Sequence, residues 1–107
     1  MIAKLRGMVD DVAADTVILD VSGVGYLVHA SSRTLSQLPP RGEEVSLHIE
    51  MIVREDAMTL FGFKGTIERD MFRLLTSVQG VGAKVGLAIL SVLEPSALQN
   101  AIAAQDR

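Results

Sequence analysis

Hydrophobic and polar residues alternate along the first 63 residues of the chain. The alternation is strictest in residues 45–54, where Val45, Leu47 and Ile49 are apolar and the residues between them are polar. A period of two places every second side chain on the same face, which is typical of a half-buried β-strand. Similar patterns predict five strands, at residues 2–9, 16–21, 26–30, 45–54 and 58–63.

The connections between these strands favour a small closed barrel. Residues 31–38 separate the third strand from the fourth and predict a short helix, because Pro39-Pro40 and Gly42 would stop it. Five strands with a short helix in this position are typical of the oligonucleotide-binding (OB) fold. An open five-stranded sheet fits the same periodicity and is the alternative.

A helical period replaces the alternation after residue 65. Apolar residues then recur at intervals of three and four in two stretches, Ile67 to Val78 and Val85 to Val92. This spacing lines one face of an α-helix, so it predicts two helices joined by a short turn. Thr66 is the expected N-cap of the first helix, and Glu68 lies in the first turn, where the helix dipole favours an acid.

A third helix is expected to start at Pro95, with Leu98 and Ile102 as its apolar stripe. The chain is therefore predicted to be an α+β protein with two domains. The first is a five-stranded OB-fold barrel in residues 1–63. The second is a helical domain in residues 64–107, which ends without a closing element and is expected to be incomplete.

The turn between the first two helices, residues 78–84, has the pattern of a helix-hairpin-helix motif. Two glycines in it can adopt positive φ and have no Cβ, so a phosphate group can approach the backbone closely. The amides at the start of the following helix have no helical partners, and the helix dipole favours an anion there. An ordinary helix–helix turn is the alternative. We predict a clamp for the phosphate backbone of nucleic acid, with little reading of bases, formed by Gly80, Val81, Gly82, Ala83 and Lys84.

A second Gly-Val-Gly tripeptide, at residues 23–25, tests how specific this pattern is. Its flanks alternate with period two, which predicts a turn between two strands and no phosphate site. The tripeptide alone is therefore weak evidence, and the prediction at residues 80–84 depends on the flanking helices and on Lys84.

Charge is divided unevenly between the two predicted domains. Residues 1–63 carry five basic and nine acidic side chains, a balance of −4, whereas residues 64–107 carry five basic and four acidic ones, a balance of +1. The helical part is therefore more favourable to phosphate than the net charge of −3 indicates. The chain has no cysteine, which excludes disulfides and thiolate metal sites, and it has no run long enough to span a bilayer, so we expect a cytoplasmic protein.

Six segments carry motifs that occur together in one protein family. They follow one another in register along the chain, at residues 1–7, 23–26, 53–57, 60–63, 80–84 and 87–90. With these motifs the chain resembles bacterial RuvA, a family of Holliday junction recognition proteins. In that family an OB-type barrel precedes a domain with two helix-hairpin-helix motifs, and a linker then leads to a third domain that binds the hexameric motor ATPase RuvB.

The resemblance implies structure-specific, sequence-independent binding of Holliday junction DNA in recombination and repair. Family members act as non-catalytic subunits and assemble as a homotetramer around the junction, or as an octamer where a second tetramer covers the other face. The RuvC resolvase is a further candidate partner. Compared with that pattern, we expect residues 1–107 to hold only the first hairpin, without the second hairpin and the motor-binding domain.

The resemblance also assigns a role to the acidic pair Glu55-Asp56. In the family, a carboxylate pair at the hairpin between the fourth and fifth strands forms a pin near the junction centre, where it repels phosphates and helps to part the strands. This role accounts for an acidic domain in a DNA-binding protein. Without the family, Glu-Asp at a hairpin tip is a solvated turn. The neighbouring Arg54 has two alternatives, contact with a phosphate or an ion pair with Glu55.

Two other functions fit parts of the sequence. A helix-hairpin-helix nuclease or glycosylase module would use Glu55 and Asp56 to hold Mg²⁺, but neighbouring strand residues point to opposite faces and no third carboxylate is placed nearby. An oligomerisation scaffold would pack the apolar face of residues 87–93 between subunits and not within one. His29 and His48 lie in strand patterns and are expected to be packed or solvated. We therefore expect no catalytic residue, no metal and no cofactor.

Overall fold

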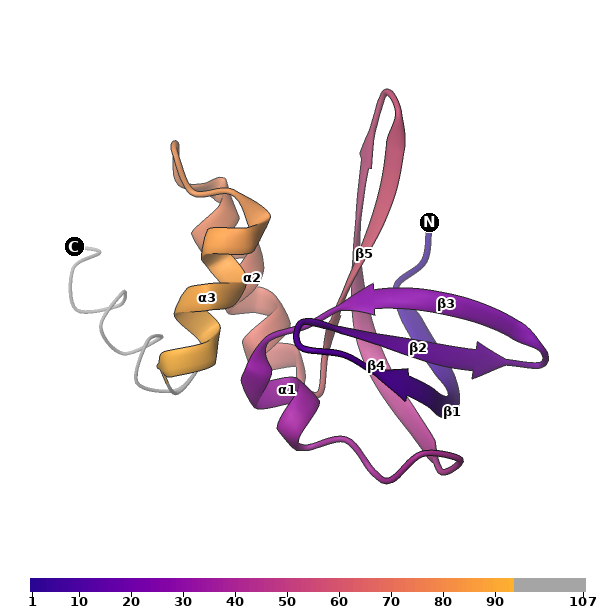
Figure 1. Cartoon of the computed structure of the whole chain (residues 1–107). Coiled ribbons are helices and arrows are strands. Elements are labelled where there is room, and N and C mark those ends of the chain that lie inside the picture. The colour runs from indigo at the N-terminus through magenta and orange to yellow at the C-terminus, as the bar shows by residue number, and fades with distance from the viewer. Residues whose placement is uncertain (94–107) are drawn as a thin grey trace.

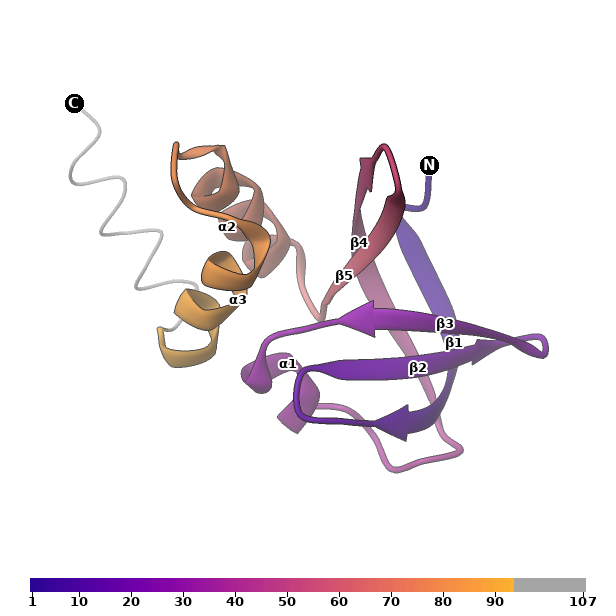
Figure 2. The same cartoon turned by 45° about the horizontal axis from the view of Figure 1, so that its top comes forward.

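The computed structural model describes residues 1–93 of the chain. A five-stranded barrel forms one part of the molecule, and two helices joined by a tight turn lie beside it (Figure 1, Figure 2). In these residues the elements are β1 (Lys4–Val12), β2 (Thr16–Val21), β3 (Val24–His29), α1 (Ser32–Ser36), β4 (Glu44–Arg54), β5 (Ala57–Phe63), α2 (Thr66–Ser77) and α3 (Ala83–Val92).

The barrel closes through a parallel pair of strands. The strands are hydrogen-bonded in the order β1-β2-β3-β5-β4, and β1 pairs with β4 to complete the circle. β3 and β5 run parallel, with Val28 beside Leu60 and His29 beside Phe61. The predicted closed barrel is confirmed. The open sheet is wrong, because the pairing of β3 with β5 leaves the sheet without an open edge.

Apolar side chains fill the barrel from alternate positions of its strands. On β4, Val45, Leu47 and Ile49 are buried, in agreement with the period-two pattern of the sequence. The same alternation continues to Val53, yet this side chain is 60% exposed. Burial stops there because the distal parts of β4 and β5 form a long hairpin that extends beyond the barrel (Figure 1).

The Gly-Val-Gly tripeptide at residues 23–25 belongs to a strand connection, as predicted. The turn between β2 and β3 consists of Ser22 and Gly23, which have φ angles of 53° and 91°. Two successive positive φ angles are characteristic of the tight hairpin turns that match the twist of the flanking strands. Asp20 Oδ1 accepts a hydrogen bond of 2.7 Å from the Gly23 amide, and Val24 and Gly25 already lie in β3.

The two predicted helices are present, but the expected N-cap of the first one is wrong. Gly65 occupies the N-cap position of α2 with extended backbone, and no side chain there bonds to the first-turn amides. Thr66 is already the first helical residue, because the chain leaves the extended conformation one residue earlier than expected. α1 does have a side-chain cap, since Ser31 Oγ accepts a hydrogen bond from the Thr34 amide.

The third predicted helix, which would begin at Pro95 and carry Leu98 and Ile102, lies outside the described residues. Within residues 1–93, no helix has the length and apolar character needed to cross a membrane.

A second hydrophobic core joins the helices to the outer surface of the barrel. Phe61 and Phe63 of β5 are buried against Phe72 of α2, with ring centroids 5.1 Å and 5.0 Å from that of Phe72. Leu87 and Leu90 of α3 are buried in the same cluster. The α2–α3 hairpin is therefore packed on the barrel, and these two leucines of α3 are used within the chain.

Candidate nucleic-acid interface

The turn between α2 and α3 is the first part of the candidate site. Gly80 has a φ of +89°, the left-handed conformation that favours glycine. The same expectation for Gly82 is wrong, because its φ is −83° and its ψ 175°. The chain reverses direction at Gly80, whereas Gly82 is the N-cap of α3, a position whose backbone is normally extended.

The start of α3 offers backbone amides to an incoming anion. The first N–H groups of a helix have no acceptor within the helix, and Gly82 supplies no side chain to cap them. Gly80, Gly82 and Lys84 are exposed, and no atom lies within 4 Å of the place a Cβ would take at either glycine. A phosphate group can therefore approach the amides of residues 83–85, where the helix dipole favours it.

A groove of about 670 Å³ lies between α3 and the barrel. Gly82, Ala83 and Lys84 line it on the helical side, and Arg54 of β4 lines it on the barrel side. In the described part of the chain, neither Arg54 nor Lys84 forms an ion pair, so Arg54 does not pair with Glu55. The fold thus brings Arg54 to the same groove as three of the predicted binding residues that follow it by about thirty positions in the sequence.

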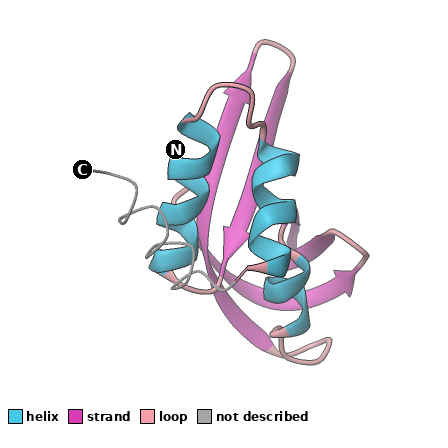
Figure 3. Cartoon of the chain, turned by 90° about the vertical axis from the view of Figure 1, so that its left-hand side faces the viewer, coloured by secondary structure: helices cyan, strands magenta, loops and turns pink. Residues whose placement is uncertain are grey.

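Glu55 and Asp56 form the tip of the β4–β5 hairpin. Arg54 is the register partner of Ala57, so the turn consists of the two acidic residues alone, and both are exposed. The hairpin projects beyond the barrel toward the same end of the molecule as the α2–α3 turn (Figure 1, Figure 3). The acidic hairpin tip and the amide-rich turn therefore lie at the same end of the molecule.

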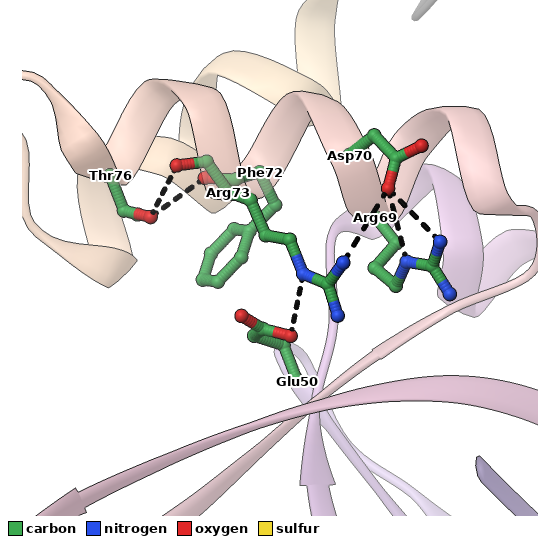
Figure 4. A network of polar contacts seen from close by, with 6 residues as sticks. All are labelled: Glu50, Arg69, Asp70, Phe72, Arg73 and Thr76. Carbon is green, nitrogen blue, oxygen red and sulfur yellow. Dashed lines mark hydrogen bonds and ion pairs between the residues drawn. The ribbon is translucent and has the colours of Figure 1, made fainter. Parts of the chain in front are cut away.

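Two basic residues of α2, Arg69 and Arg73, form ion pairs with acidic side chains. Arg73 Nε lies 2.9 Å from Glu50 Oε1 on β4, and Arg69 Nη2 lies 3.0 Å from Asp70 Oδ1 (Figure 4). Because the Arg73 and Asp70 side chains are about half exposed, each pair contributes at most about 1 kcal/mol. Neither arginine lines the groove, where Lys84 and Arg54 are the Lys and Arg side chains present.

Sequence reasoning missed a buried polar contact that joins α2 to the barrel. Glu68 is only 7% exposed, and its Oε1 accepts a hydrogen bond of 2.5 Å from Thr34 Oγ1 on α1. Burial raises the pKa of the Glu68 carboxyl, while the hydrogen bond from Thr34 and the charge of Arg33 offset part of that rise. The spacing from Glu68 to Met71 and Phe72 places it on the buried face of the helix, which was the available indication.

Glu68→Gln is expected to stabilise the protein at neutral pH. A raised pKa means that the folded protein binds this proton more tightly than the unfolded chain does. The stabilisation from the protonated carboxyl is therefore complete below the ordinary pKa of 4.5 and is lost as the pH rises through the higher pKa of the folded state. Glutamine keeps the acceptor for Thr34 without a charge. Urea unfolding of the wild type and of Glu68→Gln from about pH 4 to about pH 8 measures the difference in the free energy of unfolding. A wild type that is more stable than the variant at neutral pH would contradict the expectation.

The two histidines occupy packed strand positions. His29 is half-buried against Phe61, with ring centroids 5.7 Å apart, and it lines the groove. His48 is half-buried on β4, beside Phe63 of β5 in the register. Within residues 1–93, no three His, Asp or Glu side chains are grouped so that they could hold a metal ion. These positions agree with the expectation that both histidines are packed or solvated.

Comparison with known proteins identifies the family. Residues 1–62 match the family described as the RuvA N terminal domain. Over all 107 residues the chain is 61% identical to the Holliday junction branch migration complex subunit RuvA of Afipia carboxidovorans and 60% identical to that of Methylocella silvestris. The alignments cover 52% and 51% of these proteins, so the chain spans about half the length of the curated relatives it matches. The resemblance inferred from the motifs is therefore confirmed, and the chain belongs to the RuvA family.

Proposed function

We propose that this protein binds four-way (Holliday) junction DNA, without sequence preference, as a non-catalytic subunit of a branch migration complex. One observation carries the proposal: the groove that joins the start of α3 to Arg54 and Lys84 opens beside a hairpin tipped by Glu55 and Asp56. The name of the relatives, Holliday junction branch migration complex subunit RuvA, supports it.

The arms of the junction are held by their phosphates. Amides of residues 83–85 donate hydrogen bonds to phosphate oxygens, and the positive end of the α3 dipole adds to the attraction. Lys84 and Arg54 neutralise phosphates from the two sides of the groove. Contacts of this kind position the duplex but carry no base information, which accounts for binding that is independent of sequence.

The crossover is shaped by repulsion. A carboxylate about 4 Å from a phosphate is disfavoured by about 1 kcal/mol in water and by about 4 kcal/mol near a protein surface. A continuous duplex lying across the tip would bring its phosphates close to Glu55 and Asp56, whereas a junction parts its strands at that place. The tip therefore acts against plain duplex, while the α3 clamp holds both kinds of DNA.

Assembly and partners follow from the same proposal. Four copies surround the junction as a homotetramer, or eight as two facing tetramers, and the ATP-driven RuvB motor is a separate protein. RuvC resolvase acts on the same junction. The subunit itself makes and breaks no covalent bond and works in the cytoplasm. Val53 and Met58, register partners on the hairpin that are 60% and 69% exposed, are apolar surface compatible with burial between subunits.

Salt dependence tests the clamp. Lys84→Ala and Arg54→Ala should each weaken binding to junction and duplex alike and should each reduce the slope of log K against log salt by about 1, because each removes one neutralised phosphate. Fluorescence anisotropy with labelled DNA over a range of salt measures this slope. Arg41→Ala is the matched control, since Arg41 lies in the loop between α1 and β4, outside the groove lining. An equal loss of slope in the control would contradict the assignment.

Two further measurements separate the alternatives. Incubation of a labelled junction with Mg²⁺ should leave it intact, and specific cleavage products would favour the nuclease. Light scattering combined with binding assays tests the scaffold. An oligomer that binds junction and duplex equally, or binds neither, would leave only the scaffold function.

A further inference from the structure

The short helix α1 touches both helices of the α2–α3 hairpin. It lies in the connection between β3 and β4 and thus belongs to the barrel, yet Figure 1 shows it beside the ends of α2 and α3 that are remote from their turn. The Ser32 amide donates to Ser91 Oγ on α3 at 3.0 Å, and Arg33 Nε donates to the Leu90 carbonyl oxygen at 3.4 Å. α1 therefore fastens the end of α3.

The start of α2 is fastened by a directed chain of hydrogen bonds. Ser31 Oγ donates to Thr34 Oγ1 at 3.3 Å, and Thr34 Oγ1 donates its single proton to Glu68 Oε1 at 2.5 Å. The three residues are 1%, 0% and 7% exposed. The carboxylate is largely buried and is stabilised by this hydrogen bond and by the charge of Arg33, so loss of the Thr34 hydroxyl would remove one of its few stabilising interactions.

The Thr34–Glu68 contact lies where a small tilt of α2 moves the α2–α3 turn. Glu68 lies in the first turn of α2, whereas Gly80 follows the far end of that helix. α2 has 12 residues and is about 18 Å long, so a tilt of about 10° at its base would move the turn by about 3 Å. A shift of that size is as large as a hydrogen bond. Phe72 and Arg73 hold the middle of α2 against the barrel, whereas the Thr34–Glu68 contact holds its first turn.

We propose that Thr34 and Glu68 are positioning residues for junction recognition, which set the angle of the α2–α3 hairpin and thereby the spacing between the phosphate clamp and the Glu55-Asp56 tip. This inference rests on the proposed function. Binding of duplex needs only the clamp, whereas preference for a junction needs clamp and tip at a fixed separation. Loss of the contact therefore reduces the preference for junction over duplex more than it reduces affinity for duplex.

Four variants test this proposal, and each of the two positions has one variant that removes the contact and one that keeps it. Thr34→Val removes the hydroxyl at nearly constant volume, and Thr34→Ser keeps it. Glu68→Ala removes the acceptor, and Glu68→Gln keeps it. We expect Thr34→Val and Glu68→Ala to lower the ratio of junction to duplex affinity by about tenfold, the factor typical of one lost hydrogen bond to a charged group, and we expect the conservative partners to stay within about twofold of the wild type.

If the wild type prefers junction over duplex and Thr34→Val keeps that preference, the inference is overturned. A merely structural role would lower both affinities together and leave their ratio unchanged, which would overturn it as well. If Glu68→Ala does not fold, as judged by thermal melting, Thr34→Val decides the outcome. A wild type without any junction preference would instead refute the proposed function.

A second readout does not depend on DNA. The chain contains no cysteine, so cysteines introduced at Gln79 and Ala57 carry the only spin labels, one next to the clamp and one next to the tip. Pulsed electron paramagnetic resonance on labelled protein mixed with an excess of cysteine-free protein of the same variant then gives the distribution of distances between the two labels of one chain. We expect Thr34→Val to broaden or shift this distribution by about 3 Å and Thr34→Ser to leave it unchanged. Identical distributions in all four variants would overturn the inference even if the proposed function holds.

Discussion

Replacing Glu55 with Gln and Asp56 with Asn together is expected to tighten binding to plain duplex by about tenfold at low salt, while binding to a four-way junction changes by about twofold or less. The two side chains form the whole turn of the β4–β5 hairpin and are exposed, so the substitutions remove charge without disturbing a packed contact. The gain arises because phosphates of a continuous duplex no longer meet two negative charges at the tip.

The control for this experiment removes the same two negative charges from another part of the surface. Asp10 and Asp11 are neighbouring exposed acids on β1, away from the hairpin, and Asp10→Asn with Asp11→Asn alters the net charge by the same amount. If this control tightens duplex binding equally, the effect is one of net charge and the tip has no special role. A fall in duplex affinity when Glu55 and Asp56 are neutralised would contradict the pin directly.

Much of the fold could be predicted from the sequence because it is determined by local period. The alternation of residues 45–49 specifies one buried face, and the structure buries it. The predicted stripes of α2 and α3 were less accurate, because Ile67, Val78, Val85 and Val92 are 50% to 77% exposed while Phe72, Leu87 and Leu90 are buried. Closure of the barrel was less accessible, since it depends on parallel pairing of β3 with β5, which are distant in the chain. The exposure of Val53 could not be predicted, because periodicity identifies a face but not how far along the strand the barrel extends.

The candidate site was predictable in its parts but not in its arrangement. The turn at residues 80–84 and the acidic pair were recognised from short motifs, whereas the groove that unites Lys84 with Arg54 arises only when α3 packs beside the barrel. Glu68 was assigned to the helix dipole because its partner, Thr34, is 34 residues away in the sequence. Contacts between side chains of different elements have no local pattern, and these were the ones missed.

The two glycines of the clamp are expected to respond differently to substitution. Gly80→Val places a β-branched residue at a φ of +89°, which strains the turn by about 2 kcal/mol. The turn should therefore rearrange, and affinity for both junction and duplex should fall by about tenfold or more. Gly82→Ala meets no such strain, because its φ is −83° and no atom lies within 4 Å of the new Cβ. It should therefore lower the free energy of unfolding by only about 1 kcal/mol or less, the cost of alanine in place of glycine at an N-cap.

Gly82→Ala consequently distinguishes an effect on folding from an effect on the approach of a phosphate to the backbone. A methyl group at the N-cap of α3 stands where a phosphate would approach the amides of residues 83–85, so the variant should fold normally and still bind DNA more weakly, by about threefold to tenfold. Melting curves and anisotropy titrations of the two variants give both quantities. Full DNA affinity in a stable Gly82→Ala protein would mean that phosphates do not approach the backbone there, and full affinity in Gly80→Val would mean that the shape of the turn is irrelevant. Either result would shift the binding energy from the amides to the side chains of Lys84 and Arg54, whose salt slopes would then have to account for all of it.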